Sequence, residues 1–355
     1  MKAGASMLVP CMILATVLAC WTSPSVALGS GSPRATMDRE LRSDESAVKK
    51  GVNPRIFGGT TISPTVNPWM VHIEFYFDYD NPQYCGGSYI GSASSTSHFF
   101  LTAANCIPTD RSSITKFFAL FFFDDVDFYY SNDEDAFWLA VVNYTVGHDV
   151  LFNPHPAFSA MTSGSLENDI AIVEIQQYMD PADLPPPVSL ADAGSSINDG
   201  TSVQVLGYGA TNEDPDNDEL RSVYLNAVDT DDCASTYELS SDLDQYLCAA
   251  APGKGICDRD FGGPLFLTQG SEDIQLGIAS FSDGCDRGGY PGVYTSVAAY
   301  KSWIDSVVGP GVVNYTSYTG SNGEDDTDGT SPSSATRRIL GVSFVLSLAA
   351  GLFML

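Results

Sequence analysis

Few residues in this 355-residue chain could act as a general base near neutral pH. Histidine is the side chain whose ordinary pKa suits that task, and the chain has 4 histidines. None lies beside a recognisable nucleophile motif. We therefore expect ordinary surface or core side chains at His72, His98, His148 and His155.

Carboxylates are far more abundant, and many gather in three acidic clusters, at residues 124–127, 132–135 and 213–219. Clusters of carboxylate oxygens can bind calcium. The third cluster has Asp-x-Asp-x-Asp spacing, but it lacks the Gly and the distal Glu of an EF-hand loop. Solvated acidic loops are therefore the favoured interpretation, with calcium as the alternative. No other metal or cofactor is expected.

The acidic excess runs through the whole central region. Residues 56–308 hold 36 Asp and Glu against 7 Lys and Arg, and the formal net charge of the chain is −28. Such a surface repels phosphate backbones, so we expect no nucleic-acid partner. Basic extracellular proteins or cations are the natural counterparts, although the charge could equally serve only to keep the protein soluble.

The N-terminus has the pattern of a secretory signal peptide, predicted over residues 1–27. An apolar run follows Lys2 and ends in Ser25-Val26-Ala27, the small-x-small pattern of a cleavage site. This run is too short to span a bilayer comfortably. Residues 28–55 are polar and without periodicity, as in a propeptide or linker.

The C-terminus ends in a polar stretch, residues 309–338, and an apolar tail, residues 339–355. This order is typical of a GPI-attachment signal, with a single-pass anchor as the alternative. Arg337 and Arg338 precede the tail rather than follow it, which favours lipid attachment. The sequence thus predicts an extracellular or cell-surface protein attached to the membrane through its C-terminal tail.

Export through an oxidising compartment lets the cysteines form disulfides. Cys11 and Cys20 leave with the signal peptide, and an even number of others in an exported chain predicts three disulfides, with 15 pairings open. The six are Cys85, Cys106, Cys233, Cys248, Cys257 and Cys285. Two sequons, at Asn143 and Asn314, predict glycosylation on the same route.

The elements that must position these residues are mostly short strands. Six β-branched and aromatic runs are separated by Gly, Pro, Asn and Asp: residues 69–77, 117–123, 137–146, 170–175, 202–206 and 274–281. This pattern predicts an all-β barrel or sandwich. A proline-rich stretch at 180–187 divides the region, and one helix is predicted from the apolar spacing between Val297 and Val307.

Several ordered segments resemble the chymotrypsin/trypsin family of serine proteases, over essentially all of residues 55–308. They are Arg55-Ile56-Phe57-Gly58-Gly59, Cys85-Gly86-Gly87-Ser88, Leu101-Thr102-Ala103-Ala104-Asn105-Cys106, Asn168-Asp169-Ile170-Ala171, residues 257–265, residues 277–281 and residues 290–294. The resemblance implies two six-stranded antiparallel β-barrels with a cleft between them, a crossover at 180–187 and a C-terminal helix. It also implies the pairings Cys85–Cys106, Cys233–Cys248 and Cys257–Cys285.

The sequence departs from the family where the chemistry would be. Asn105 stands at the position of the catalytic His, and a carboxamide cannot accept a proton from a hydroxyl. Phe261 stands at the position of the nucleophilic Ser. Arg259 replaces a Gly whose N–H helps bind the oxyanion, and a side chain disfavours the backbone that Gly permits. Only Asp169 remains, and we expect Asn105 to donate its amide hydrogens to it.

Other family positions carry weaker expectations. Arg55 and Ile56 resemble the activation site, which makes an ion pair between the Ile56 amino group and Asp260 an expectation. Five residues match the walls of the specificity pocket: Gly255, Ser280, Phe281, Ser282 and Gly292. Gly255 replaces the Asp that selects basic side chains, so an apolar side chain is favoured there.

The resulting prediction is a protease homologue without a working triad that binds an extracellular protein as an inhibitor, decoy or adhesion module. One alternative is a serine endopeptidase with an atypical active site. Another is an evolutionary remnant without function.

Overall fold

The computed structural model describes residues 58–77, 82–121, 149–160, 166–209, 219–239, 242–257, 259–285 and 287–320. Several expectations fall on other residues: the signal peptide, the linker, Arg55, Ile56, His148, the sequon at Asn143, the apolar tail and the acidic clusters except Glu219.

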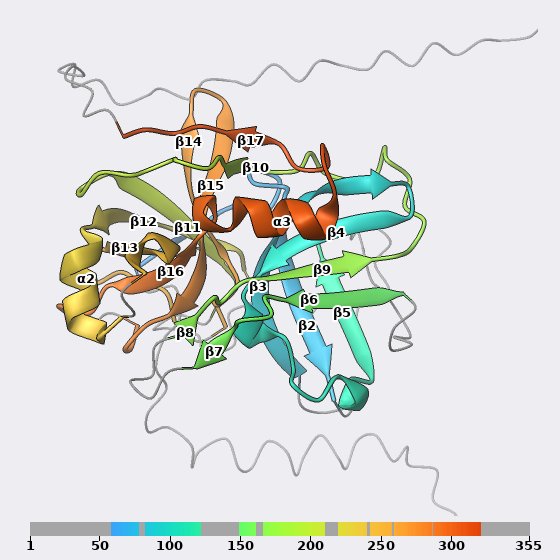
Figure 1. The fold of residues 1–355 in the computed structure, drawn as a ribbon, viewed down its shortest axis with the longest axis horizontal. Helices are drawn as coiled ribbons and strands as arrows, with labels where there is room; N and C mark the ends of the chain where they lie inside the picture. Colours follow the sequence, from blue (N-terminus) through green and yellow to red (C-terminus); the bar gives the residue numbers. More distant parts are fainter. Residues whose placement is uncertain are drawn as a thin grey trace, which may run out of the picture. The chain divides into compact units, whose positions relative to one another are not determined.

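One sheet contains six strands, each antiparallel to its neighbours, in the order β5-β2-β3-β4-β9-β6. In chain order the strands are β2 (Met70–Tyr76), β3 (Pro82–Ser94), β4 (Ser97–Thr102), β5 (Lys116–Leu120), β6 (Val150–Pro154) and β9 (Ala171–Ile175). Aromatic rings fill its interior. Phe75, Phe117 and Phe152 pack with centroids 5.2–5.7 Å apart. These strands carry the blue, cyan and green labels on the right of Figure 1.

The other sheet closes into a ring of six strands, β14-β11-β12-β13-β16-β15, because β14 also pairs with β15. They are β11 (Ser202–Gly207), β12 (Arg221–Val228), β13 (Tyr246–Ala250), β14 (Pro264–Gln269), β15 (Glu272–Phe281) and β16 (Gly292–Ser296). Three short strands extend this sheet: β1 (Thr60–Thr61), β10 (Ser189–Ala191) and β17 (Tyr315–Thr316). The predicted all-β fold is confirmed, with this sheet as a closed six-stranded barrel and the first sheet as a curled half-barrel of six strands; β10 adds two parallel pairings.

The connections also follow the prediction. Residues 176–188, including the proline-rich stretch, carry the chain from β9 in one sheet to β10 in the other. A two-stranded sheet of β7 (Ser159–Ala160) and β8 (Leu166–Glu167) precedes β9. Single turns of 3-10 helix are η1 (Ala104–Cys106), η2 (Arg111–Ser113), η4 (Leu243–Gln245) and η5 (Ala298–Tyr300).

Two α-helices lie among the described residues, and the sequence pattern predicts one of them. The expected C-terminal helix is α3 (Lys301–Val308), which buries Ile304 and Val308. Helix α2 (Thr230–Tyr237) was not expected, because Cys233 is its one buried residue and it has no apolar stripe. The Asp229 carboxylate caps α2 by accepting from the Asp231 N–H.

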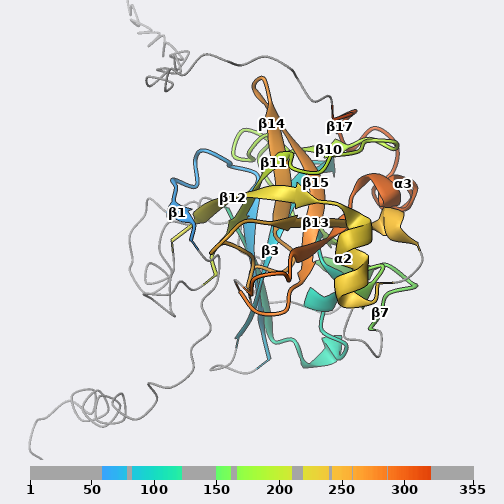
Figure 2. The same ribbon diagram turned by 90° about the vertical axis from the view of Figure 1, so that its left-hand side faces the viewer.

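The folded chain continues beyond the predicted domain end at residue 308. The Leu190 N–H donates to the Asn314 carbonyl at 2.8 Å, and β17 lies beside β10 in both views (Figures 1 and 2). Val313 is buried, and the Tyr315 hydroxyl donates to Asp305 at 2.9 Å. Residues 309–320, the first twelve residues of the predicted stalk, thus belong to the folded domain and lie beside the second sheet. No helix among the described residues is long and apolar enough to cross a membrane.

The six predicted cysteines pair as the family resemblance implied. The bonds are Cys85–Cys106, Cys233–Cys248 and Cys257–Cys285. Three disulfides in one domain are typical of proteins that fold in an oxidising compartment.

Candidate functional site

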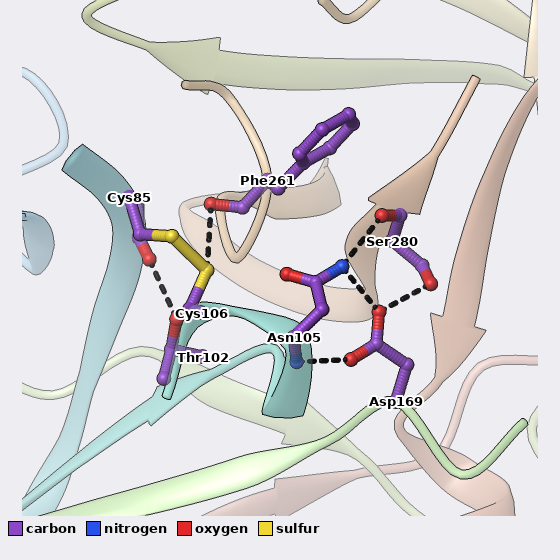
Figure 3. Close-up of a disulfide and its surroundings, with 8 residues drawn as sticks. Cys85, Thr102, Asn105, Cys106, Asp169, Phe261 and Ser280 are labelled. Atoms are coloured by element: carbon purple, nitrogen blue, oxygen red, sulfur yellow. Dashed lines mark hydrogen bonds between the residues drawn. A yellow bond between two sulfur atoms is a disulfide. The ribbon is translucent and has the colours of Figure 1, made fainter. Parts of the chain in front are cut away.

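The candidate site forms where turns from both sheets meet. Thr102, the last residue of β4, pairs with Ala171, the first residue of β9. The turn after β4 carries Asn105 and the turn before β9 carries Asp169, so this pairing places the two side chains together. The end of β15 brings Ser280 to the same place (Figure 3).

Asp169 is the centre of a buried hydrogen-bond network. Its Oδ1 accepts the Asn105 backbone N–H at 2.7 Å. Its Oδ2 accepts from the Asn105 carboxamide at 2.8 Å and from the Ser280 hydroxyl at 2.5 Å. The same Asn105 nitrogen donates to the Ser280 carbonyl at 2.9 Å. The expected Asn105–Asp169 contact is confirmed, and the Asn105 carboxamide nitrogen acts as a donor to both Asp169 and Ser280.

Burial dominates the protonation of Asp169, which is 1% exposed. It raises the pKa of this carboxyl from 3.8 to about 6, while hydrogen bonds from Ser280 and from the backbone of Asn105 and Ala104 act in the opposite direction. The hydrogen bonds therefore keep the Asp169 carboxyl ionised at neutral pH, although its buried surroundings disfavour a charged group.

Phe261 occupies the loop before β14 and packs against the cores of both sheets. Its carbonyl accepts the Gly86 N–H at 2.8 Å, and its ring points away from Asp169 (Figure 3). The next residue, Gly262, has a φ of +82°, and a Cβ there would collide with Thr102 Oγ1 and the Gly86 carbonyl. The loop keeps a tightly fixed backbone, but its side chain at position 261 carries no nucleophile.

Arg259 adopts the backbone conformation that its side chain was expected to disfavour. Its φ is +72°, in the left-handed region. An L-residue there is strained by roughly 1–2 kcal/mol. The surrounding turn holds the loop, because the Asp260 N–H donates to the Cys257 carbonyl at 3.0 Å and Cys257 is disulfide-bonded. Tertiary contacts thus override the local preference.

Asp260 is fully buried beneath this loop. Its two carboxylate oxygens accept the N–H groups of Gly209 and Cys257, each at 3.1 Å. The predicted partner, the Ile56 amino group, lies outside the described residues, so that ion pair stays a prediction.

The predicted pocket residues divide into two groups. Gly255, Ser282 and Gly292 line a cavity of about 440 Å³. Ser280 instead turns its hydroxyl to Asp169, and Phe281 packs edge-on against Tyr237 at 5.3 Å.

Sequence reasoning missed Ile256, which is buried beside Gly292 and also lines the cavity. The sequence signal that could have identified Ile256 as a cavity residue is its position next to Cys257. Ile256 adds apolar surface to the wall of this cavity.

The described histidines are structural, as expected. His98 is buried and its ring bonds Ser92 Oγ at 2.6 Å; burial lowers its pKa, while contacts with the Ser95 and Gln177 carbonyls raise it. His155 packs edge-on against Tyr300 and Trp303. His72 lies 3.4 Å from Glu74 and stacks on Tyr84.

Metal and glycan expectations are tested only in part. The described residues contain no group of three or more His, Cys, Asp or Glu side chains that could hold a metal ion. The acidic clusters proposed for calcium fall almost entirely on other residues. Asn314 is exposed, as an attached glycan requires, at the start of the extended segment that pairs with β10.

Comparisons with known proteins agree with this architecture. The trypsin family model matches residues 56–304. Trypsin delta of Drosophila erecta is 30% identical over 255 residues, which cover 70% of this chain and 87% of the relative. Trypsin 5G1 of Aedes aegypti is 26% identical over 302 residues, covering 84% and 97%. Urokinase-type plasminogen activator of Gallus gallus is 29% identical over 263 residues, covering 71% and 57%.

Proposed function

This chain belongs to the trypsin family, and we propose that it acts by binding an extracellular protein rather than by cleaving peptide bonds. One observation carries the proposal: the carboxamide of Asn105 bonds the buried Asp169, and the loop before β14 carries the phenyl ring of Phe261, which points away from Asp169. Neither group can attack a carbonyl carbon or accept a proton from a nucleophile at neutral pH.

The size of the expected loss supports this conclusion. Removing the Ser or the His of a catalytic triad lowers turnover by about 10⁶-fold. Both positions are substituted here, and Arg259 alters the loop that would bind the oxyanion. The scaffold around them is retained, including three disulfides and the fixed backbone at Gly262. A folded domain with a substituted reaction centre fits a role as an inhibitor, decoy or adhesion module.

A fluorophosphonate probe tests the proposal, because labelling requires an activated nucleophile. The purified natural chain should show no covalent labelling and no ester hydrolysis, beside an active trypsin as positive control. Stoichiometric labelling of the natural chain would overturn the proposal in favour of an endopeptidase with an atypical site.

Matched variants calibrate that experiment. The triple variant Asn105→His, Arg259→Gly, Phe261→Ser should gain labelling at position 261 and hydrolyse an activated ester at least 100-fold faster than the natural chain. The double variant Asn105→His, Arg259→Gly keeps Phe261 and should stay unlabelled. Labelling of the double variant would place a nucleophile elsewhere in the molecule.

We further propose that the protein is exported and attached to the cell surface by a C-terminal lipid anchor. The apolar tail at residues 339–355 and the three disulfides support this location. Phosphatidylinositol-specific phospholipase C should release the protein from intact cells, and a variant that ends at residue 338 should be secreted. Protein that stays on the cells after the lipase would indicate the single-pass alternative.

A further inference from the structure

The position of the Arg259 side chain is not explained by its contacts within the protein. Its guanidinium carbon lies 4.9 Å from the centre of the Tyr84 ring, which also stacks with His72 at 5.4 Å. Arg259 is exposed, so solvent reaches the guanidinium. A guanidinium that rests on a ring face keeps its edge N–H donors available for a planar acceptor such as a carboxylate.

The charge of Arg259 is not neutralised within the described part of the protein. Arg287 and Lys301 pair with Asp283 and Asp305. Arg111 and Arg221 donate to the backbone carbonyls of Phe152 and Gly59.

The Arg259 side chain, by contrast, donates to no protein atom of the described residues, and the Tyr84 ring is the contact recorded for it. Within the described part of the chain, the Arg259 guanidinium therefore has no carboxylate partner.

The backbone of Arg259 adds an independent observation. Three non-glycine residues of the described chain have positive φ: Asn168, Glu238 and Arg259. The Asn168 side chain is bonded to Ala157 and Tyr300, and Glu238 ends helix α2. The Arg259 side chain makes no such hydrogen bond, and its backbone is held by the turn around Asp260 and Cys257. Residues kept in strained backbone conformations cluster at ligand-binding sites, so this outlier supports a functional role for Arg259.

We propose that Arg259 is a recognition residue for a carboxylate carried by a bound peptide segment. The carboxylate, from a Glu or Asp side chain, pairs with the guanidinium. The cavity lined by Gly255, Ile256 and Gly292 takes an apolar side chain of the same segment, since Gly255 and Ile256 come shortly before Arg259 in the chain. The inference rests on the proposed binding function and names the class of ligand: an extended peptide with one acidic and one apolar residue.

The acidic surface and the Arg259 cation act together. The net charge of −28 repels uniformly acidic proteins, so a favoured partner is neutral or basic overall and presents a carboxylate only at the cleft. An exposed ion pair contributes modestly, which makes discrimination of roughly fivefold to tenfold the reasonable expectation.

Peptide titration tests the inference. The probes are blocked pentapeptide mixtures with one fixed position, either Glu or Gln, and apolar or neutral residues elsewhere. They are titrated against the full processed chain at physiological salt. The Glu mixture should bind at least fivefold more tightly than the Gln mixture. Arg259→Gln should remove this difference, and Arg259→Lys should keep part of it.

Lys301→Gln is the matched control, because it removes a cation that lies over the Tyr315 ring, already has Asp305 as carboxylate partner and does not line the cavity. It should leave the preference for Glu unchanged. Equal binding of the two mixtures would overturn the inference, as would an equal loss in both variants, which would reflect net charge alone. Thermal unfolding of each variant confirms that it is folded.

Two further outcomes separate this inference from its rivals. A preference for Glu that emerges only after Asp214→Asn, Asp216→Asn and Asp218→Asn would mean that the chain's own carboxylates occupy the site, which contradicts a partner peptide. Fluorophosphonate labelling would overturn the proposed function without touching the peptide preference, so the two failures are distinguishable.

Discussion

The two sides of the candidate site depart from the family pattern in different ways. On the carboxylate side, formed by Asn105, Asp169 and Ser280, every substituted or retained polar group still has a partner. On the loop side, Arg259 and Phe261 bear side chains with no relation to hydrolysis. A buried carboxylate must keep its donors, because burying an unpaired charge is strongly unfavourable. A hydroxyl at an accessible position has no such requirement, so it can be lost freely.

The loop side has one rigid component, the backbone at Gly262, and this gives the largest expected effect. Gly262→Ala should lower the free energy of unfolding by about 4 kcal/mol, since a Cβ collides with Thr102 Oγ1 and the Gly86 carbonyl and the φ is +82°. Gly270→Ala is the matched control: its φ is +65°, but nothing lies within 4 Å. It should cost only about 1 kcal/mol in urea unfolding. Equal effects would show that the loop is not sterically fixed.

The carboxylate side should give stability a pH dependence. The folded protein holds the Asp169 proton more tightly than the unfolded chain, because burial raises the pKa from 3.8 to about 6. This contribution is fully present below about pH 4 and is lost as the pH rises through 6. The stability of the natural chain relative to Asp169→Asn should therefore fall by about 2 kcal/mol between pH 4 and 7, as measured by urea unfolding at each pH. Parallel profiles would contradict the shift.

A pair of leucine substitutions compares the two sides directly. Asn105→Leu removes donors to Asp169 and to the Ser280 carbonyl, and should cost about 2 kcal/mol at pH 7. Phe261→Leu exchanges one apolar side chain for another at a half-buried position, and should cost less than about 1 kcal/mol. A larger loss for Phe261→Leu would reverse the proposed order of the two sides.

The smallest expected effect is a gain. Arg259→Gly relieves the strain at φ +72° and should raise the free energy of unfolding by about 1 kcal/mol, while abolishing the preference for acidic peptides. Arg259→Ala keeps a Cβ at the same φ and should bring no gain in thermal unfolding. A stabilised alanine variant would indicate that the guanidinium, rather than the backbone, is the source of strain.

Much of the fold followed from local patterns in the sequence. Alternating β-branched and aromatic runs predicted strands such as β2 and β11, and apolar spacing predicted α3. The disulfide pairing followed from family resemblance, since spacing alone left every pairing open. Helix α2 was missed because it buries too little apolar surface to leave a periodic pattern. Strand β17 was missed because its partner, β10, lies more than 120 residues earlier in the chain.

The sequence by itself determined which side chains stand at the family's triad positions, because residue identity fixes which atoms are present, and it predicted the contact between Asn105 and Asp169. Only the tertiary structure decided that Asn105 also donates to the Ser280 carbonyl, and that Arg259 takes a left-handed backbone above Tyr84. Such outcomes depend on groups brought together from distant segments, whose combined packing and hydrogen bonding outweigh the preferences of any one residue.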